Sequence, residues 1–133
     1  KTAAGYYDYD EKRMPTPAAV TAELFAEVAA AQGIIQGDIS DEEILDRCLL
    51  PMINEGAKIL DEGIAVRASD IDVTYVYGYG WPVYRGGPMH YANSMGLDKV
   101  LAKINHYHET TGDDFWAPSS LLVSLAEQGK RFK

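Results

Sequence analysis

The sequence has one cysteine and no long hydrophobic run, and both shortages exclude classes of protein. Cys48 cannot form a disulfide within the chain, so nothing indicates an oxidising compartment. No apolar stretch approaches the roughly 20 residues of a membrane-spanning helix, and no signal peptide opens the chain. We therefore expect no membrane span. Because Lys1 is not a methionine, we also expect a piece of a longer protein.

Positive charge is scarce as well. The chain carries 12 Lys and Arg residues against 20 Asp and Glu residues, which gives a formal net charge of −8. Such a surface repels the phosphates of nucleic acids and of anionic lipids. The composition thus predicts that nucleic acid is not a partner.

The sequence also lacks recognisable catalytic and metal-binding patterns. His106 and His108 are two residues apart, which places them on different sides of a helix, and His90 is distant from both. No serine or cysteine stands in a nucleophile motif. Cys48 lies on the expected core face of a long helix, where we interpret it as packing. We therefore predict no metal site and no complete catalytic set.

Helical periodicity, by contrast, is abundant, and 133 residues with 47% hydrophobic content suit one domain. Helices are predicted over 18–32, 40–63, 68–78, 97–112 and 119–129, with a further helix opening at Pro88. The fold class is all-α. Residues 1–16 contain prolines and alternating aromatics and predict an irregular N-terminal arm, so the helical domain spans 17–133.

Residues 40–63 give the strongest helical signal. Ser40 and Glu43 have the spacing of a capping box, in which each side chain accepts from the other residue's backbone N–H. Ile44, Cys48 and Met52 follow at helical spacing. This pattern predicts the core helix of the domain, with that stripe facing inward.

The stretch "YGYGWPVYRGGP", from Tyr77 to Pro88, is either a phosphate-binding loop or a pair of turns between helices. Trp81 would fill the space of a phosphate, and Pro82 removes a backbone donor, so we favour the turns. The interface and turn motif comprises Gly78, Gly80, Trp81, Pro82, Arg85, Gly86, Gly87 and Pro88. Arg85 is able to meet an anion such as a CoA phosphate, but we favour an ion pair with an acid of the same chain.

Three stretches resemble one family: "KTAAGYYDYD", "EEILDRCLLPMINEGAKILDEGIA" and "SDIDVTYVYGYGWPVYRGGPMHYANSMGLDKVL". They are similar to the C-terminal part of 3-hydroxyacyl-CoA dehydrogenases, and more narrowly to the second of two helical domains that end multifunctional fatty-acid β-oxidation enzymes. The resemblance implies a fold like the C-terminal domain of 6-phosphogluconate dehydrogenase. It also implies that NAD and the catalytic histidine belong to a Rossmann domain outside this chain.

The resemblance therefore implies no catalytic or cofactor-binding residue in this chain. The family's substrate-contacting asparagine has no counterpart here, since the matching place reads Asp46-Arg47-Cys48. That departure suits a second, non-catalytic copy of the helical domain. The parent enzyme would oxidise 3-hydroxyacyl-CoA with NAD and carry enoyl-CoA hydratase activity as well.

The same resemblance implies partners. The two helical domains of such enzymes pack as an internal pseudo-dimer, so we expect an interface formed by Trp81, Tyr84 and Met89 above the long helix. The expected partners are the preceding helical domain, the Rossmann domain and the parent's acyl-CoA substrate. We expect an intracellular location, cytoplasmic if bacterial and otherwise peroxisomal. Two alternatives stay open: a free-standing helical interaction module, and a small CoA-binding protein that uses Arg85.

Overall fold

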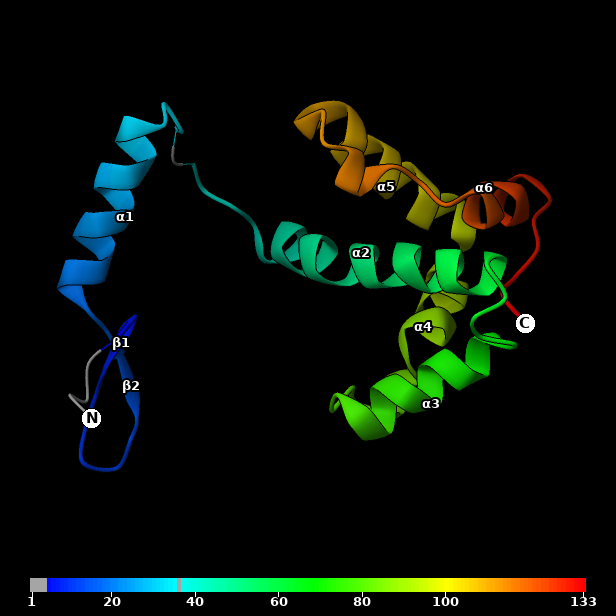
Figure 1. Cartoon of the computed structure of the whole chain (residues 1–133), viewed down its shortest axis with the longest axis horizontal. Coiled ribbons are helices and arrows are strands. Elements are labelled where there is room, and N and C mark those ends of the chain that lie inside the picture. Colours follow the sequence, from blue (N-terminus) through cyan, green and yellow to red (C-terminus); the bar gives the residue numbers. More distant parts are fainter. Residues whose placement is uncertain (1–4, 36) are drawn as a thin grey trace. The chain divides into compact units, whose positions relative to one another are not determined.

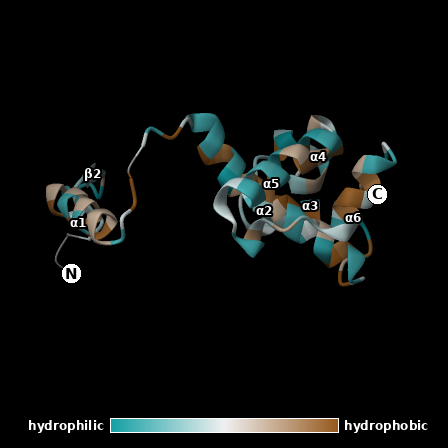
Figure 2. Ribbon diagram, turned by 90° about the horizontal axis from the view of Figure 1, so that it is seen from above, coloured by the Kyte–Doolittle hydropathy of each residue, from teal (hydrophilic) through white to brown (hydrophobic). Residues whose placement is uncertain are grey.

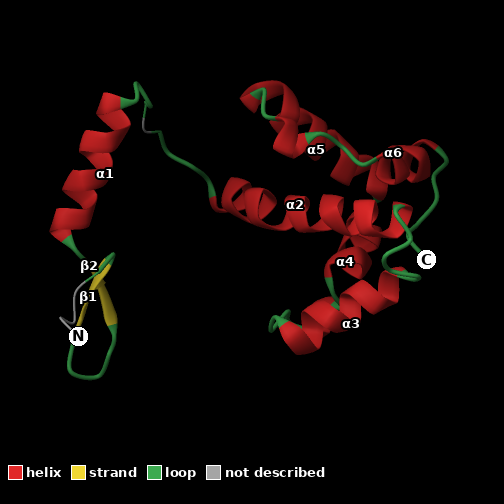
Figure 3. Cartoon of the chain, in the orientation of Figure 1, coloured by secondary structure: helices red, strands yellow, loops and turns green. Residues whose placement is uncertain are grey.

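The computed structural model describes residues 5–35 and 37–133, and they form two compact units. The N-terminal unit ends at Ile39, and the C-terminal unit spans Ser40–Lys133. Figure 3 shows helices throughout, with strands only in the N-terminal unit among the described residues. The all-α class predicted from the sequence is confirmed.

A small hairpin opens the N-terminal unit. Strand β1 (Tyr7–Tyr9) pairs antiparallel with β2 (Pro15–Pro17), so that Asp8 lies opposite Thr16. The Asp10 carboxylate accepts from the backbone N–H of Met14 at 2.8 Å and closes the loop between the strands. A proline is tolerated in an edge strand because the sheet needs no donor there.

The hairpin occupies the described part of the segment over 1–16 for which an irregular arm is predicted, and residues 1–4 lie outside the described residues. The predicted domain boundary between residues 16 and 17 stays a prediction. The structure groups the hairpin with the helix that follows it, and the division between the units falls after Ile39.

Helix α1 spans Ala19–Ala31, close to its predicted range. Its expected apolar stripe is present but uncovered: Val20, Leu24 and Val28 are 75%, 53% and 45% exposed. No residue of α1 is buried.

The C-terminal unit is built around one long helix. Helix α2 lies between α5 and α6 on one side and α3 and α4 on the other, as Figure 1 shows. The helices of this unit are α2 (Asp41–Asp61), α3 (Ala68–Gly78), α4 (Pro88–Met95), α5 (Leu97–Thr111) and α6 (Ser120–Glu127), with short 3₁₀ turns at Val83–Arg85 and Asp114–Trp116. Figure 2 shows hydrophobic residues where these helices face one another.

Helix α2 begins as its sequence predicts. The Ser40 hydroxyl accepts from the backbone N–H of Glu43 at 3.2 Å. The reciprocal half of the expected capping box is replaced by another contact, because the Glu43 carboxylate pairs with Arg47 one turn later, at 2.8 Å. The helix then runs without interruption through Pro51 to Asp61.

The core uses a different stripe of α2 from the predicted one. Leu50, Ile53 and Ala57 are fully buried, whereas Ile44 and Cys48 are exposed. The interpretation of Cys48 as a packed core residue is therefore wrong. The buried stripe meets residues from three other helices, namely Met89, Val100, Ile104 and Leu122.

Two asparagine side chains, the buried Asn54 and the half-buried Asn93, hold loops against this core. The Asn54 amide donates to the backbone carbonyl of Ala117 at 2.9 Å and accepts from the N–H of Ser119 at 2.8 Å. The Asn93 amide donates to the backbone carbonyl of Phe132 at 3.1 Å and accepts from the N–H of the same residue at 2.9 Å. Each amide supplies both a donor and an acceptor, so it satisfies a backbone segment that no helix pairs.

Asp72 joins α3 to the start of α4. Its carboxylate accepts from the backbone N–H of Met89 at 2.7 Å and from that of His90 at 3.1 Å, and so caps α4 from a neighbouring helix. Gly87, at φ +96°, stands directly against Asp72, where a Cβ atom would collide with the carboxylate. Partial burial raises the pKa of the Asp72 carboxyl, and the two backbone donors oppose that shift.

Replacing this cap is expected to destabilise the C-terminal unit. Asp72→Ala leaves two N–H groups of α4 without an acceptor, and we expect it to lower the free energy of unfolding by about 1–2 kcal/mol. Asp72→Asn keeps an acceptor oxygen and is the matched control, with a smaller loss. Urea unfolding followed by circular dichroism measures both. Equal unfolding midpoints for Asp72→Ala and the unmodified chain would contradict the cap.

Lys103 of α5 bridges two acids of α2. Its Nζ lies 2.7 Å from Asp46 Oδ2 and 2.8 Å from Glu42 Oε1. The two carboxylates raise the pKa of Lys103, and the ammonium lowers the pKa of Glu42. This pairing links the first turns of α2 to the middle of α5.

The bridge predicts a pH-dependent contribution to stability. Because the folded pKa of Glu42 is lowered, its contribution is present above the unfolded value of about 4.3 and is lost as pH falls through the folded value. The raised pKa of Lys103 keeps its own contribution in place up to alkaline pH. We expect Lys103→Met to lower the thermal midpoint at pH 7, and the difference from the unmodified chain to vanish near pH 2. Lys99→Met, at an exposed position of α5, is the control. A difference that is constant across this range would exclude the ionic origin.

Candidate functional site

The glycine-rich stretch forms two successive turns between α3 and α4. Helix α3 ends at Gly78, and the Trp81 N–H donates back to the carbonyl of Tyr75 at 3.1 Å across Gly80. Gly80 has φ +73°, a conformation that glycine adopts without a steric cost. The chain then passes through the 3₁₀ turn Val83–Arg85 and two further positive-φ glycines before Pro88 opens α4.

The glycines of the second turn serve the backbone. A Cβ atom on Gly86, at φ +73°, would lie 2.6 Å from the His90 ring, and Gly87 has the same lack of room beside Asp72. The Gly86 N–H is already used, since it donates to the Val83 carbonyl at 3.0 Å. These two glycines therefore allow close packing of the turn on α3 and α4.

Trp81 holds the turn against aromatic neighbours. Its ring lies edge-on to Tyr75 and to Tyr91, with centroid distances of 6.2 Å in both cases. The indole N–H is buried and has no hydrogen-bond partner among the described residues. The aromatic contacts, each worth roughly 0.5–1.5 kcal/mol beyond area burial, fix the ring in place.

Arg85 makes a different contact from the one predicted. Its guanidinium lies 5.4 Å from the ring centre of Tyr84 and 6.0 Å from that of Tyr91. Within the part of the chain that the structure describes, Arg85 forms no ion pair, so the expected intramolecular pair is wrong. Tyr84 is exposed and Tyr91 is half-buried, and a cation over an exposed ring is held by only about 0.5–1 kcal/mol. Arg85 itself is exposed, so its charge stays accessible.

The turn borders a hollow of about 280 Å³ that we call the turn groove. Its lining is Leu45, Leu49, Trp81, Pro82, Tyr84, Arg85 and Tyr91. The exposed face of α2 continues the apolar surface, since Ile44 and Leu45 are 49% and 57% exposed and Cys48 is exposed. The lining of the groove contains one cation, Arg85, and no acid–base pair.

The interface predicted from the sequence stays a prediction. Trp81 and Tyr84 of that set line the groove, whereas Met89 is fully buried beneath Gly56 of α2. Leu45 and Leu49 were not predicted. Their four-residue spacing on α2 is a second apolar stripe, and that spacing was the available signal.

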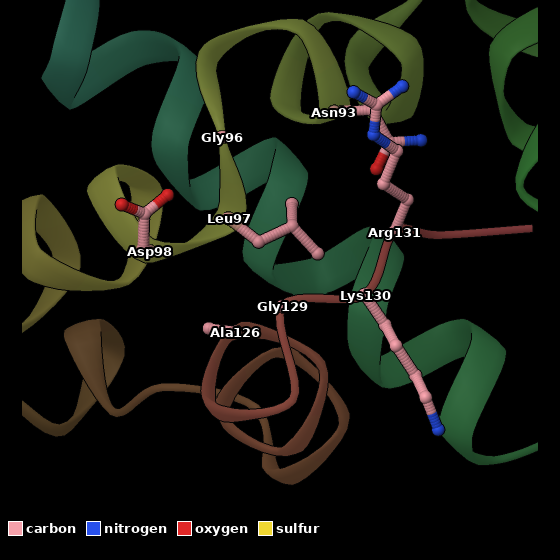
Figure 4. Close-up of a pocket in the computed structure, with 8 residues that line it drawn as sticks. All are labelled: Asn93, Gly96, Leu97, Asp98, Ala126, Gly129, Lys130 and Arg131. Atoms are coloured by element: carbon pink, nitrogen blue, oxygen red, sulfur yellow. The ribbon is translucent and has the colours of Figure 1, made fainter.

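A second hollow, of about 160 Å³, lies between the start of α5 and the C-terminal segment (Figure 4). Leu97 projects into it, while the Lys130 side chain extends away. The Asn93 amide at its edge is already engaged by the backbone of Phe132. We therefore interpret this hollow as a gap in the packing between α5 and the C-terminal segment.

The described ranges 5–35 and 37–133 contain neither a metal-binding cluster nor a membrane-spanning helix. No cluster of three His, Cys, Asp or Glu side chains is placed to hold a metal ion there. Of the two histidines on α5, His106 packs beside Tyr107 and His108 lies 3.9 Å from Asp114. None of the helices described has the length and apolar character that a bilayer crossing requires.

The sequence is similar to those of known enzymes over nearly its whole length. The peroxisomal bifunctional enzyme of Homo sapiens is 42% identical over 132 residues, which cover 97% of this chain and 18% of that protein. The fatty acid oxidation complex subunit alpha of Vibrio vulnificus is 34% identical over 132 residues, covering 99% of this chain and 18% of that protein. The chain thus spans about a fifth of the length of these relatives.

A solved structure gives the same result in three dimensions. The crystal structure of (S)-3-hydroxybutyryl-CoA dehydrogenase from Ralstonia eutropha superposes with a TM-score of 0.62 at 27% identity, over 88% of this chain and 41% of that one. The sequence model of the 3-hydroxyacyl-CoA dehydrogenase C-terminal domain matches residues 44–132, which is most of the C-terminal unit. The chain belongs to the family of 3-hydroxyacyl-CoA dehydrogenase C-terminal domains.

Proposed function

We propose that this chain is the terminal helical domain of a longer NAD-dependent 3-hydroxyacyl-CoA dehydrogenase of fatty-acid β-oxidation. The observation that carries the proposal is the family match over residues 44–132, together with relatives that align over 97% of the chain. The name "bifunctional" of one relative supports a parent with a second activity, and we propose that this is enoyl-CoA hydratase activity. The parent enzyme would work in the peroxisome or in the bacterial cytoplasm.

In this proposal the domain braces the enzyme and carries no chemistry of its own. The parent would move a hydride from C3 of the 3-hydroxyacyl-CoA to NAD, while a histidine takes the hydroxyl proton. NAD would be bound by the Rossmann domain of the parent, and the acyl-CoA by the parent enzyme. No residue of this chain is assigned to catalysis, to the cofactor or to a metal.

The turn groove is the surface that we assign to docking of the preceding helical domain. Leu45 and Leu49 contribute nothing to the core of the C-terminal unit, which is filled by the other stripe of α2. Aromatic residues and arginine, the groove's main lining, are enriched in protein interfaces. A free-standing interaction module is not favoured, because the relatives are large multifunctional enzymes.

The first test is activity. The 133-residue chain by itself should not reduce NAD in the presence of a 3-hydroxyacyl-CoA, because the proposed nicotinamide site and base lie in other domains. Absorbance of NADH at saturating substrate measures this. A rate above the buffer blank from the pure chain would contradict the assignment, and the parent enzyme serves as the positive control.

The second test separates stability from docking. Trp81→Ala removes a half-buried ring from its aromatic contacts, and we expect a loss near the low end of the ~3–5 kcal/mol seen for buried tryptophans. Arg85→Ala and Leu45→Asp, both at exposed positions, should barely change the denaturant midpoint but weaken binding to the rest of the dehydrogenase. Val73→Asp, at an exposed site of α3 outside the groove, is the matched control.

Binding of the separately produced dehydrogenase portion, followed by calorimetry, gives the docking affinity. Two results together would contradict the turn interpretation. Trp81→Ala would melt like the unmodified chain, and Arg85→Ala would abolish binding of free CoA. The glycines would then belong to a ligand site.

A further inference from the structure

The N-terminal unit has apolar side chains but almost no core. Among its described residues, Ala18 alone is buried. Tyr6 and Phe25 are more than half exposed although their rings lie only 6.2 Å apart. Folded units bury most of their large apolar side chains, so this one lacks a covering surface.

Helix α1 has the composition of a helix that is buried on several sides. Its charged residues are Glu23 and Glu27, which are four apart and therefore share one line along the helix. The rest of its circumference is apolar apart from Thr21, and Figure 2 shows hydrophobic residues along it. A helix that is apolar nearly all round belongs inside a larger core.

The unit's internal contacts are too few to stabilise it alone. Beyond the Tyr6–Phe25 ring contact, the Thr21 hydroxyl donates to the Gly5 carbonyl at 3.4 Å. An isolated helix shorter than about 12–15 residues is marginal in water, and so is a single two-stranded hairpin. The hairpin and α1 also border an open apolar hollow of about 440 Å³, which a further body of protein would fill.

The comparisons indicate where that body lies. The family match begins at residue 44, after the end of the N-terminal unit at Ile39. The relatives nevertheless align over 97% of the chain, and this chain is only 18% of their length. The unit is therefore a regular part of the long enzymes and lies outside the domain that the C-terminal unit forms.

We propose that the N-terminal unit is the closing segment of the helical domain that precedes it in the parent enzyme, and that α1 is a core helix of that domain. This inference rests on the proposed function, because it requires a parent chain upstream. The surface that α1 presents is the stripe of Val20, Leu24 and Val28, and its complement is an apolar face of the preceding domain. The C-terminal unit then begins as an independent domain at Ser40.

Hydrogen exchange compares the 133-residue chain with the parent enzyme. We expect the amides of α1 to exchange at nearly unfolded rates in the chain alone and at least about tenfold more slowly in the parent, with α2–α6 protected in both. Protection of α1 in the chain alone would overturn the inference. If that protection is independent of concentration, α1 packs on the C-terminal unit, and if it rises with concentration, α1 packs on a second copy.

Substitutions provide an independent readout. Leu24→Asp in the parent should lower the unfolding midpoint of the preceding domain, and Glu27→Gln, on the charged line of α1, is the matched control. The same Leu24→Asp change in the 133-residue chain should leave the melting of the C-terminal unit unchanged. If Leu24→Asp prevents folding of the parent, Leu24→Ala supplies a graded loss. Equal effects of Leu24→Ala and Glu27→Gln in the parent would overturn the inference.

Failure of the proposed function is distinguishable from failure of this inference. A parent that protects α1 but does not oxidise 3-hydroxyacyl-CoA contradicts the proposed function and supports the placement of α1. An active parent in which α1 exchanges as fast as in the chain alone supports the function and overturns the placement.

Discussion

The close approach of α3 to the start of α4 is the constraint on which the C-terminal unit depends. It requires a carboxylate at Asp72 to accept from the first free N–H groups of α4, and a residue without a side chain at Gly87 to let that carboxylate in. The same cap holds Met89 in the core against Gly56 of α2. The two turns before α4 are thus fixed from both ends, by Trp81 at one and by Asp72 at the other.

Helix α2 carries two apolar stripes, and only packing tells them apart. The buried stripe contains Leu50 and Ile53, while Ile44 and Cys48 remain on the surface with Leu45. Both stripes satisfy helical spacing, so periodicity alone could not select the inner one. The neighbouring helices decide, because α4, α5 and α6 cover the stripe of Leu50, Ile53 and Ala57 and leave the other stripe exposed.

The sequence predicted those local features that depend on the chemistry of a single residue type, such as a cap or a helix end. The cap at Ser40 and the helix end at Gly78 depend only on neighbours in the chain, and Pro88 marks the opening of α4 although the cap of that helix comes from Asp72. The hairpin over residues 7–17 escaped because the Asp10 side chain closes its loop without a glycine turn signal. The contact of Arg85 with two tyrosine rings was not predicted, because it depends on which elements fold beside Arg85.

The burial of Phe132 sets the order in which this fold can form during synthesis. Its ring packs in the core, and its backbone is held by Asn93, while α2 at the other end of the unit waits for Ala117 and Ser119. The chain up to Phe132 must therefore have left the ribosome before α2 has a complete core to join. Until then, the inner stripe of α2 lacks part of its cover, and an incompletely folded chain with exposed apolar surface is prone to aggregate.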